Sequence, residues 1–384
     1  MRFQDRKFKE SMKMISNKYL AIAGLTLIAG IPAAQAVDFG AFGDVSYQGS
    51  SEKHTADSFV QGQFDLYATQ KIDPKTRVFV EMVFEAGPDN AYGLDLERLN
   101  ITRQLTPGLS VAWGRFHTPI GYWNTAYHHG ALIQDTVFRP TFLDFEDGNG
   151  AIFPTHIIGI MADGKVSTGG GDLNYMLAVG NGSSINTTGC TTSPLTCPGS
   201  EIDVHNVQDT QDKKMVVGAV NYKMSSVPLQ FGVFALHDPF AESNASTSGV
   251  TTPNSDLISM QVWGADVHYV SHGFDMIAES YNIENKDKVG TAGSNKASAY
   301  YVQFGYRVTD KFKPIYRYES VDFQTKDPYF QYLGTPEGGR HVLDLRYDLD
   351  DTNALKFEVS RFEPVQTGVK SYTSYALQWA FLML

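Results

Sequence analysis

The sequence has only two cysteines among 384 residues, Cys190 and Cys197. Both lie in the segment GCTTSPLTC, within a long polar stretch whose only nearby metal-ligand type is His205. In an oxidising compartment, two cysteines this close together typically form a disulfide, and we predict that bond here rather than a metal site. The motif CxxCH is absent, which excludes a haem attached to this chain in that way.

Positive charge is also scarce, with 31 Lys and Arg against 42 Asp and Glu and a formal net charge of −11. Nucleic-acid binding relies on clusters of Lys and Arg that neutralise phosphates. The sequence has no such tract outside its first residues, so we predict no nucleic-acid partner.

Long hydrophobic runs are missing as well. The longest, Leu20 to Ile31, spans about a dozen residues, whereas a membrane-spanning helix needs roughly 20. It follows a basic segment between Arg2 and Lys18 and precedes the small-residue motif Ala34-Gln35-Ala36. This order is typical of a secretory signal peptide. We predict that residues 1–36 are a cleaved signal and that residues 37–384, which contain no obvious linker, form one exported domain.

The sequence is rich in segments in which hydrophobic residues alternate with polar or small ones. Aromatic residues make up 12% of the chain, and two-residue hydrophobic periods recur along it. Near the C-terminus, Leu377, Trp379 and Phe381 alternate with Gln378 and Ala380. The segment RHVLDLRYD alternates in the same way, with charges on its second face. This period is typical of β-strands, and we expect the charged faces to point inward on nearly all of them.

Sixteen such segments are predicted, near 38–48, 59–71, 77–85, 95–105, 109–116, 155–162, 172–180, 214–222, 229–236, 260–270, 274–283, 297–307, 313–321, 339–348, 353–362 and 372–384. The link after every even-numbered strand is short, as in DPKT and TPG, whereas those after odd-numbered strands reach 31 to 38 residues at 183–213 and 117–154. In hydrocarbon a sheet must close so that every backbone amide is paired. These features predict an all-β fold, a transmembrane antiparallel up-and-down β-barrel. A soluble sandwich or propeller would not account for the two unequal rims.

This architecture resembles that of the sixteen-stranded porins of Gram-negative bacteria. The likeness rests on the signal, the first strand DFGAFGDVSYQG, the short turns, the long loops and the aromatic-rich last strand. A looser likeness is to the phosphate-selective porins. The chain departs from the family in ending on Leu384 rather than an aromatic residue. The resemblance implies a homotrimer in outer-membrane lipid that lets small hydrophilic solutes or ions diffuse passively.

In the porins the third long loop folds into the lumen, and here that loop is 117–154. Its many aromatic residues suit packing inside a barrel, although it could instead cover the outer mouth. Our candidates for a pore constriction are Tyr122, Trp123, Tyr127, Asp144, Glu146 and Asp147.

Basic residues fall on the predicted inward faces of several strands. The pore-wall candidates are Arg77, Arg98, Arg307, Lys313, Arg317, Arg340, Arg346 and Lys356. Opposed to an acidic loop, they would create a transverse field that orients dipolar solutes. Alternatively, they only pair with Glu319, Asp344 and Glu358 on the same faces.

Four histidines, His117, His128, His129 and His156, lie at or within the loop. Clustered imidazoles can bind a metal or titrate near neutral pH. No carboxylate–histidine spacing of a known site occurs, so we interpret them as polar loop residues and predict neither metal nor cofactor.

Three functions are compatible with a barrel. We predict a passive diffusion pore. The alternative is a barrel that sheathes a partner, such as a periplasmic electron carrier, or acts as a receptor. An enzyme is not expected, because no serine lies in a recognisable nucleophile setting.

Overall fold

The structure is a computed structural model that describes residues 37–383, except 53–54, 87–90, 128–129, 147, 149, 187–199, 204–206, 208–211, 244–255 and 367. The predicted signal peptide and the predicted Cys190–Cys197 disulfide lie outside the described residues, as do His128 and His129. In the part of the chain that is described, no helix has the length and hydropathy needed to cross a membrane.

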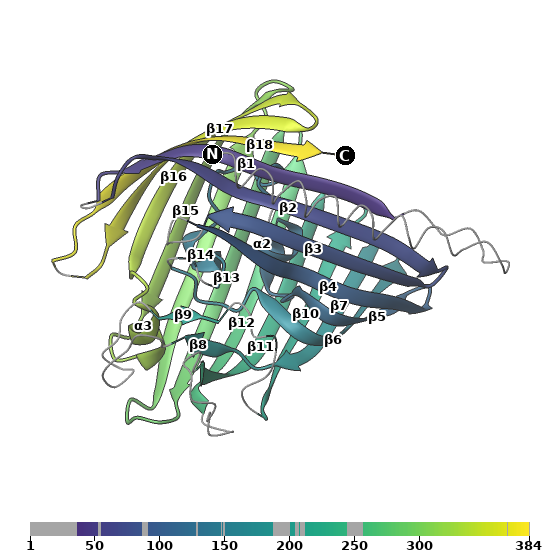
Figure 1. The fold of residues 1–384 in the computed structure, drawn as a ribbon, viewed down its shortest axis with the longest axis horizontal. Coiled ribbons are helices and arrows are strands. Elements are labelled where there is room, and N and C mark those ends of the chain that lie inside the picture. Colours follow the sequence, from purple (N-terminus) through teal and green to yellow (C-terminus); the bar gives the residue numbers. More distant parts are fainter. Residues whose placement is uncertain are drawn as a thin grey trace, which may run out of the picture. The chain divides into compact units, whose positions relative to one another are not determined.

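Sixteen antiparallel strands of the described chain close into a barrel (Figure 1). They are β1 (Asp38–Ser50), β2 (Ser58–Asp73), β3 (Thr76–Ala86), β4 (Tyr92–Thr106), β5 (Leu109–His117), β6 (His156–Thr168), β7 (Gly171–Asn181), β10 (Lys214–Met224), β11 (Leu229–Ser243), β12 (Asp256–Ser271), β13 (Phe274–Asp287), β14 (Ser294–Tyr306), β15 (Phe312–Phe323), β16 (Gly338–Asp350), β17 (Asn353–Pro364) and β18 (Tyr372–Met383). Neighbours in this order pair with each other, and β1 pairs with β18 to close the sheet. The predicted all-β, sixteen-stranded barrel is therefore confirmed.

The two rims differ in the length of their links, as predicted. The turn between β12 and β13 contains only His272 and Gly273, whose φ angles are 50° and 81°. Positive φ at both positions suits a two-residue hairpin turn, and glycine adopts it without a Cβ clash. The opposite rim carries the long links, of which the one between β5 and β6 spans residues 118–155.

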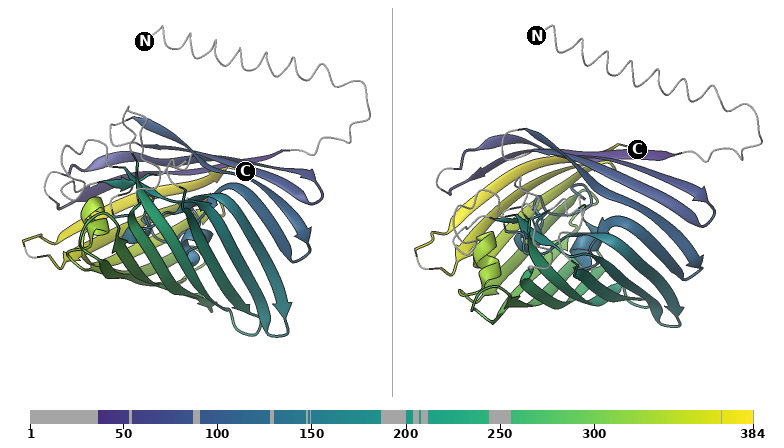
Figure 2. Two further views of the ribbon diagram at one scale, coloured as in Figure 1. Left: turned by 90° about the horizontal axis from the view of Figure 1, so that it is seen from below. Right: turned by 60° about the horizontal axis from the view of Figure 1, so that its bottom comes forward.

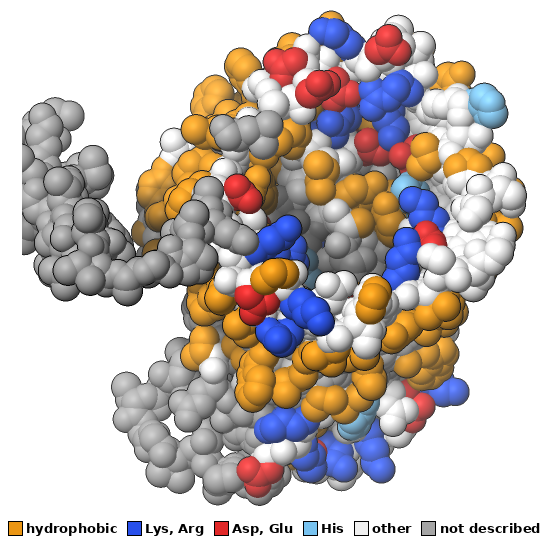
Figure 3. All heavy atoms as spheres, turned by 90° about the vertical axis from the view of Figure 1, so that its right-hand side faces the viewer, with side chains coloured by type: hydrophobic (Ala, Val, Ile, Leu, Met, Phe, Trp, Pro, Cys, Tyr) orange, Lys and Arg blue, Asp and Glu red, His pale blue; other side chains and the backbone are white. Residues whose placement is uncertain are grey.

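Outward side chains are apolar, as a lipid-facing surface requires. Trp113, Leu343 and Leu377 have exposed fractions of 66%, 62% and 51%, whereas their sequence neighbours Ala112 and Val342 are buried. Figure 3 looks onto the short-turn rim, with hydrophobic side chains over the flanks and charged ones around a central hollow. The strand alternation therefore separates an apolar outer surface from the barrel interior.

Inward side chains are of two kinds, and this corrects one sequence prediction. On β1 to β3 several are polar, as with Asp44, Asp65 and Glu81. On β11 to β14 many are apolar or aromatic and fully buried, as with Met260 and Tyr281. The expectation of charged inward faces therefore needs correction only in part: Asp238, Asp266 and Glu279 are buried on β11 to β13, but most of their inward neighbours are apolar and pack together or against the β5–β6 loop.

Smaller elements lie at the long-loop rim. Strand β8 (Ser184–Asn186) pairs with the end of β11 and with β9 (Glu201–Ile202). Helix α3 (Pro328–Leu333) begins where Asp327 accepts a hydrogen bond from the Tyr329 amide, and it ends at Gly334, whose φ is 65°. Both ends are ordinary helix caps, formed by an N-terminal Asp and a left-handed glycine.

Candidate functional site

The loop between β5 and β6 is closed at its root. The Thr118 amide donates to the Thr155 carbonyl at 2.8 Å, and Asn124 Nδ2 donates to the carbonyls of Thr118 (2.8 Å) and Thr155 (3.1 Å). Asn124 is fully buried in helix α2 (Gly121–Ala126). Figure 2 shows this helix within the ring of strands. The loop therefore leaves and re-enters the barrel wall at one point.

Aromatic side chains fix one side of the loop to β13 and β14. Trp123 is fully buried and meets the edge of the Tyr301 ring at 5.8 Å between centroids. Phe153 stacks on Tyr281 at 4.8 Å. The Trp123 amide also donates to Glu279 at 2.7 Å. Since Trp and Phe bury large areas, this contact is the principal apolar anchor of the loop.

The other two aromatic candidates lie beside this anchor. Tyr127 contacts the Trp123 ring at 5.1 Å and the Tyr122 ring at 5.6 Å. Tyr122 packs on His268 of β12 at 4.5 Å. Burial raises the pKa of Tyr122 to about 12 and also raises that of Tyr127. Both phenols therefore stay neutral at physiological pH.

Acidic side chains of the wall hold the backbone of the loop. Three wall carboxylates accept from loop amides: Asp344 from Val137 (3.0 Å), Glu358 from Phe138 (3.1 Å) and Glu319 from Thr141 (2.7 Å). These bonds satisfy backbone donors that would otherwise be buried without partners. The three acids thus attach the loop to β15, β16 and β17.

Four of the predicted basic wall residues hold the same loop. Lys313 pairs with Asp135 (2.6 Å), Arg317 donates to Thr136 Oγ1 (2.7 Å), Arg346 donates to the Leu132 carbonyl (2.6 Å), and Lys356 donates to the carbonyls of Ala131 and Thr136. Arg317 and Lys356 are each 1% exposed. The structure therefore places these four side chains on the inward wall but beneath the loop.

The remaining basic candidates are dispersed over the barrel. Arg340 donates to the Tyr372 hydroxyl at 3.0 Å and borders a cavity. Arg98 pairs with Glu81 at 2.5 Å. Arg307 pairs with Asp348 at 2.8 Å near the short-turn rim, and Arg77, at the start of β3, is exposed. These residues do not form one continuous basic face.

Two of the acidic candidates of the loop, Asp144 and Glu146, lie among the described residues. Asp147 lies outside the described residues. Burial raises the pKa of Asp144, although the nearby Arg139 guanidinium opposes this. Burial also disfavours a charged Glu146, but the His156 imidazole beside it outweighs this and lowers the Glu146 pKa to about 2. Asp144 borders two cavities, whereas Glu146 borders none of those described.

Three adjoining cavities separate the loop from the opposite wall. The first, about 330 Å³, lies near the short-turn rim beside Tyr67 and Phe79. A middle cavity of about 200 Å³ is lined by Asp44, Gln63 and Gln378 of the wall and by Arg139 and Asp144 of the loop. A third, about 430 Å³, opens toward the long-loop rim and shares Arg139 and Asp144 with the second. The first and second share Gly130. Together they follow β18, β1 and β2 through the barrel.

Among the residues named above for the middle cavity, only Asp144 was a candidate from the sequence. Asp44 and Gln378 occupy inward positions of the first and last strands, so their alternation alone could have identified them. Arg139 could not be found in this way, because it lies in the irregular part of the loop. Its guanidinium stacks over the Phe145 ring at 4.2 Å, and its side chain is largely buried.

The family model for Gram-negative porins matches residues 20–341. The chain therefore belongs to the Gram-negative porin family, and it is an outer-membrane channel protein. This membership indicates a channel rather than an enzyme and confirms the function predicted from the sequence.

Solved structures share the fold at low identity. The anion-selective porin from Comamonas acidovorans is 12% identical, with a TM-score of 0.62 over 91% of this chain and 100% of that one. The outer membrane channel DcaP of Acinetobacter baumannii is 11% identical, with a TM-score of 0.60 over 93% and 100%. Salmonella typhi OmpF in complex with daunomycin is 9% identical, with a TM-score of 0.59 over 91% and 98%. No curated protein sequence matches the chain.

Proposed function

We propose that small hydrophilic solutes and ions diffuse through this porin along the wall formed by β18, β1 and β2. The row of adjoining cavities between that wall and the loop carries the proposal. Among the described residues, the opposite side of the lumen is occupied largely by aromatic side chains of the loop and the wall. On this proposal the loop limits solute size from one side only.

The middle cavity also suggests the ion preference. Two carboxylates, Asp44 and Asp144, and one guanidinium, Arg139, line it. Rings or groups of charged side chains at a constriction favour ions of the opposite sign. We therefore expect a modest preference for cations. The Comamonas porin is described as anion-selective, so an opposite preference would distinguish two channels of one fold.

Assembly as a homotrimer surrounded by outer-membrane lipid is part of the proposal. One solved form of the similar Vibrio cholerae outer-membrane protein OmpT is a trimer. The exposed apolar belt of the barrel suits lipid and neighbouring subunits alike. We expect no catalytic activity from this chain, whose described polar contacts serve mainly to attach the loop.

The alternative function, a sheath around a partner protein, receives less support. A sheath needs a lumen wide enough for the partner. Here the loop is attached to β13, β14, β15, β16 and β17 by many polar and aromatic contacts, so a partner would first have to displace it.

Single-channel recording in a planar bilayer tests the proposal. We expect stable conductance steps and, under a salt gradient, a reversal potential of the sign that indicates cation preference. Asp44→Asn removes one of two carboxylates from the middle cavity and should abolish most of that preference. Asp172→Asn is the matched control, since Asp172 pairs with Lys165 near the β6–β7 turn, borders none of these cavities and should leave the preference unchanged. Correctly inserted barrels without conductance would contradict the diffusion pathway.

A further inference from the structure

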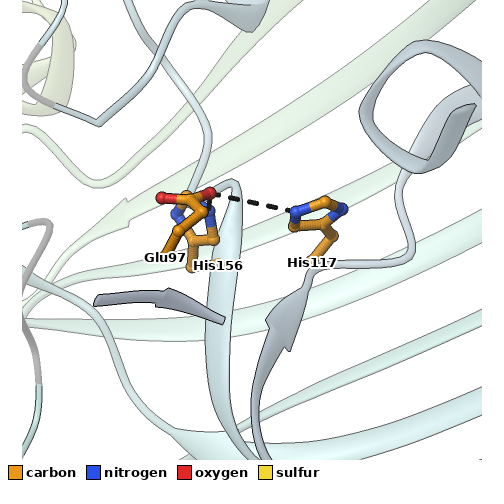
Figure 4. A group of neighbouring side chains, drawn as sticks. All are labelled: Glu97, His117 and His156. Atoms are coloured by element: carbon orange, nitrogen blue, oxygen red, sulfur yellow. Dashed lines mark hydrogen bonds and ion pairs between the residues drawn. The ribbon is translucent and has the colours of Figure 1, made fainter. Parts of the chain in front are cut away.

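Three side chains with metal-ligating atoms meet at the root of the loop. Glu97 of β4, His117 of β5 and His156 of β6 converge there (Figure 4), and one ligand atom from each lies within 4.8 Å of the others. His156 Nε2 hydrogen-bonds a Glu97 oxygen, and His117 Nε2 lies 3.8 Å from the same oxygen. Glu97 and His156 are buried, and His117 is largely so.

A β-bulge explains why Glu97 reaches the interior. Glu81 of β3 pairs with Arg98 and Met82 pairs with Leu96, so Glu97 is an extra residue in β4. A bulge of this kind redirects the side chain of the inserted residue. Here Glu97 and Arg98 both turn inward, whereas Leu96 and Leu99 on either side are each 45% exposed.

The two histidines are placed by strand register. His117 is the last residue of β5 and His156 the first of β6, and they lie opposite each other in the ladder. Their ring centroids are 5.7 Å apart. The residues that flank the long loop are thus also the residues that supply the imidazoles.

A second carboxylate orients one of these imidazoles. Glu146, fully inside the loop, lies 3.0 Å from His156 Nδ1 and accepts a hydrogen bond from Thr155 Oγ1 at 2.6 Å. This leaves His156 Nε2 directed at Glu97. A carboxylate that holds the distal nitrogen of a histidine is the usual outer partner of a metal-binding imidazole.

We propose that Glu97, His117 and His156 form a binding site for a divalent transition-metal ion such as Zn²⁺. Two imidazoles and one carboxylate are ligand types that Zn²⁺ accepts, at about 2.0–2.2 Å in tetrahedral geometry. Tetrahedral ligands at that distance lie about 3.3 Å apart, close to the 3.8 Å between His117 and Glu97. His117 also borders the cavity of about 330 Å³, which supplies an entry route and room for a water as fourth ligand.

A bound metal ion would replace the proton in the hydrogen bond between His156 and Glu97. Ligands bind an ion in their deprotonated forms, so uptake should release protons. The bound ion would join β4 to both ends of the loop and hold its root in place. This inference goes beyond the channel proposal, because metal uptake can be measured without any solute passing through the pore.

Equilibrium dialysis of the chelator-treated, folded protein in detergent against Zn²⁺ tests the site, with bound metal measured by elemental analysis. We expect one Zn²⁺ per chain. His117→Gln and Glu97→Gln should each weaken binding by at least tenfold. Glu146→Gln, which removes only the outer partner, should weaken it by about 10–100-fold. His237→Gln is the matched control, since His237 is exposed on β11 and should not change uptake.

Folding and specificity need separate controls. His156→Gln would remove the imidazole that both Glu97 and Glu146 contact. We therefore rely on His117→Gln, which keeps the contacts of His156 with both carboxylates. Retention of the folded band on unheated gels shows that each variant is intact. A His128→Asn, His129→Asn background removes the two other histidines that the sequence has between residues 117 and 154, and it should still bind one ion. Wild-type protein that binds no Zn²⁺, or binding that survives His117→Gln in that background, would overturn the proposal.

Discussion

The two sides of the lumen differ in what their inward side chains contact. On β11 to β14, apolar and aromatic residues such as Phe234 and Tyr281 pack with one another and against the loop. On β18, β1 and β2, polar residues such as Gln378 and Asp44 face cavities. Both sides are built from strands whose outward residues face lipid. The comparison teaches that lipid constrains only the outward-facing residues of each strand. The path of one loop decides whether the inward-facing residues are apolar or polar.

The largest effect is expected from Trp123→Ala, which breaks the packed side of the comparison. Trp123 is fully buried against Tyr301 and Tyr127. Truncation of a buried Trp to Ala costs about 3–5 kcal/mol. We expect the loop to detach part of the time, seen as larger and noisier single-channel currents and as faster proteolysis within the loop.

Trp113→Ala is the control for that variant. Trp113 is 66% exposed on the outer face of β5, so its loss leaves the loop contacts intact. Equal current noise in both variants would mean that the loss of any Trp disturbs the barrel. The packed side would then have no special role in holding the loop.

A smaller effect is expected from Lys356→Met, which removes a polar attachment. The Lys356 ammonium donates to the Ala131 and Thr136 carbonyls. Loss of a buried donor leaves its acceptors without partners, at about 1–3 kcal/mol. We expect a lower thermal midpoint of the folded barrel and a modest rise in current noise. Lys370→Met, on an exposed link, should change neither. An unchanged midpoint in Lys356→Met would show that water replaces the lost donor.

A still smaller effect is expected from acid. The folded-state pKa of Glu146, about 2, lies below its ordinary value of 4.5 because the His156 charge outweighs the cost of burial. A lowered carboxyl pKa stabilises the fold above the ordinary pKa, and that stabilisation is lost as pH falls. We expect steady currents above about pH 5 and increasing noise as pH falls from about 4.5 toward 2.

Glu146→Gln sharpens this test, since the amide does not titrate in that range. Its currents should be noisier than wild type at neutral pH and should change less between about pH 4.5 and 2. A variant that keeps the full acid response would assign that response to other carboxylates, with Asp144 the nearest candidate in the loop.

Much of the fold was predictable, and particular residues show why. Trp379 and Leu377 alternate with Gln378 because one face of β18 must be apolar in lipid and the other need not be. Because the same constraint applies to every strand, the alternating segments predict the number of strands. The lengths of the links between these segments predict the two unequal rims. In the structure, Lys313, Arg317, Arg346 and Lys356 lie on the inward wall beneath the loop. Their contacts were not predictable, since nothing local indicates that a segment roughly two hundred residues earlier covers them.

The candidate site was predictable only in part for a similar reason. The histidines at the ends of the loop were visible in the sequence, but the carboxylate–histidine arrangement was not. Glu97 comes from a different strand and turns inward at a bulge, and Glu146 reaches His156 through the folded loop. The spacing of these residues in the sequence indicates neither contact.

The sequence by itself determined the barrel, because the period of two and the alternating link lengths are local consequences of lipid outside and paired backbone within. It determined the porin family as well. Only the tertiary structure decided which wall the loop covers, which charges remain beside the cavities, and which carboxylates meet the two histidines. Those outcomes depend on contacts between residues far apart in the chain, which no local pattern in the sequence specifies.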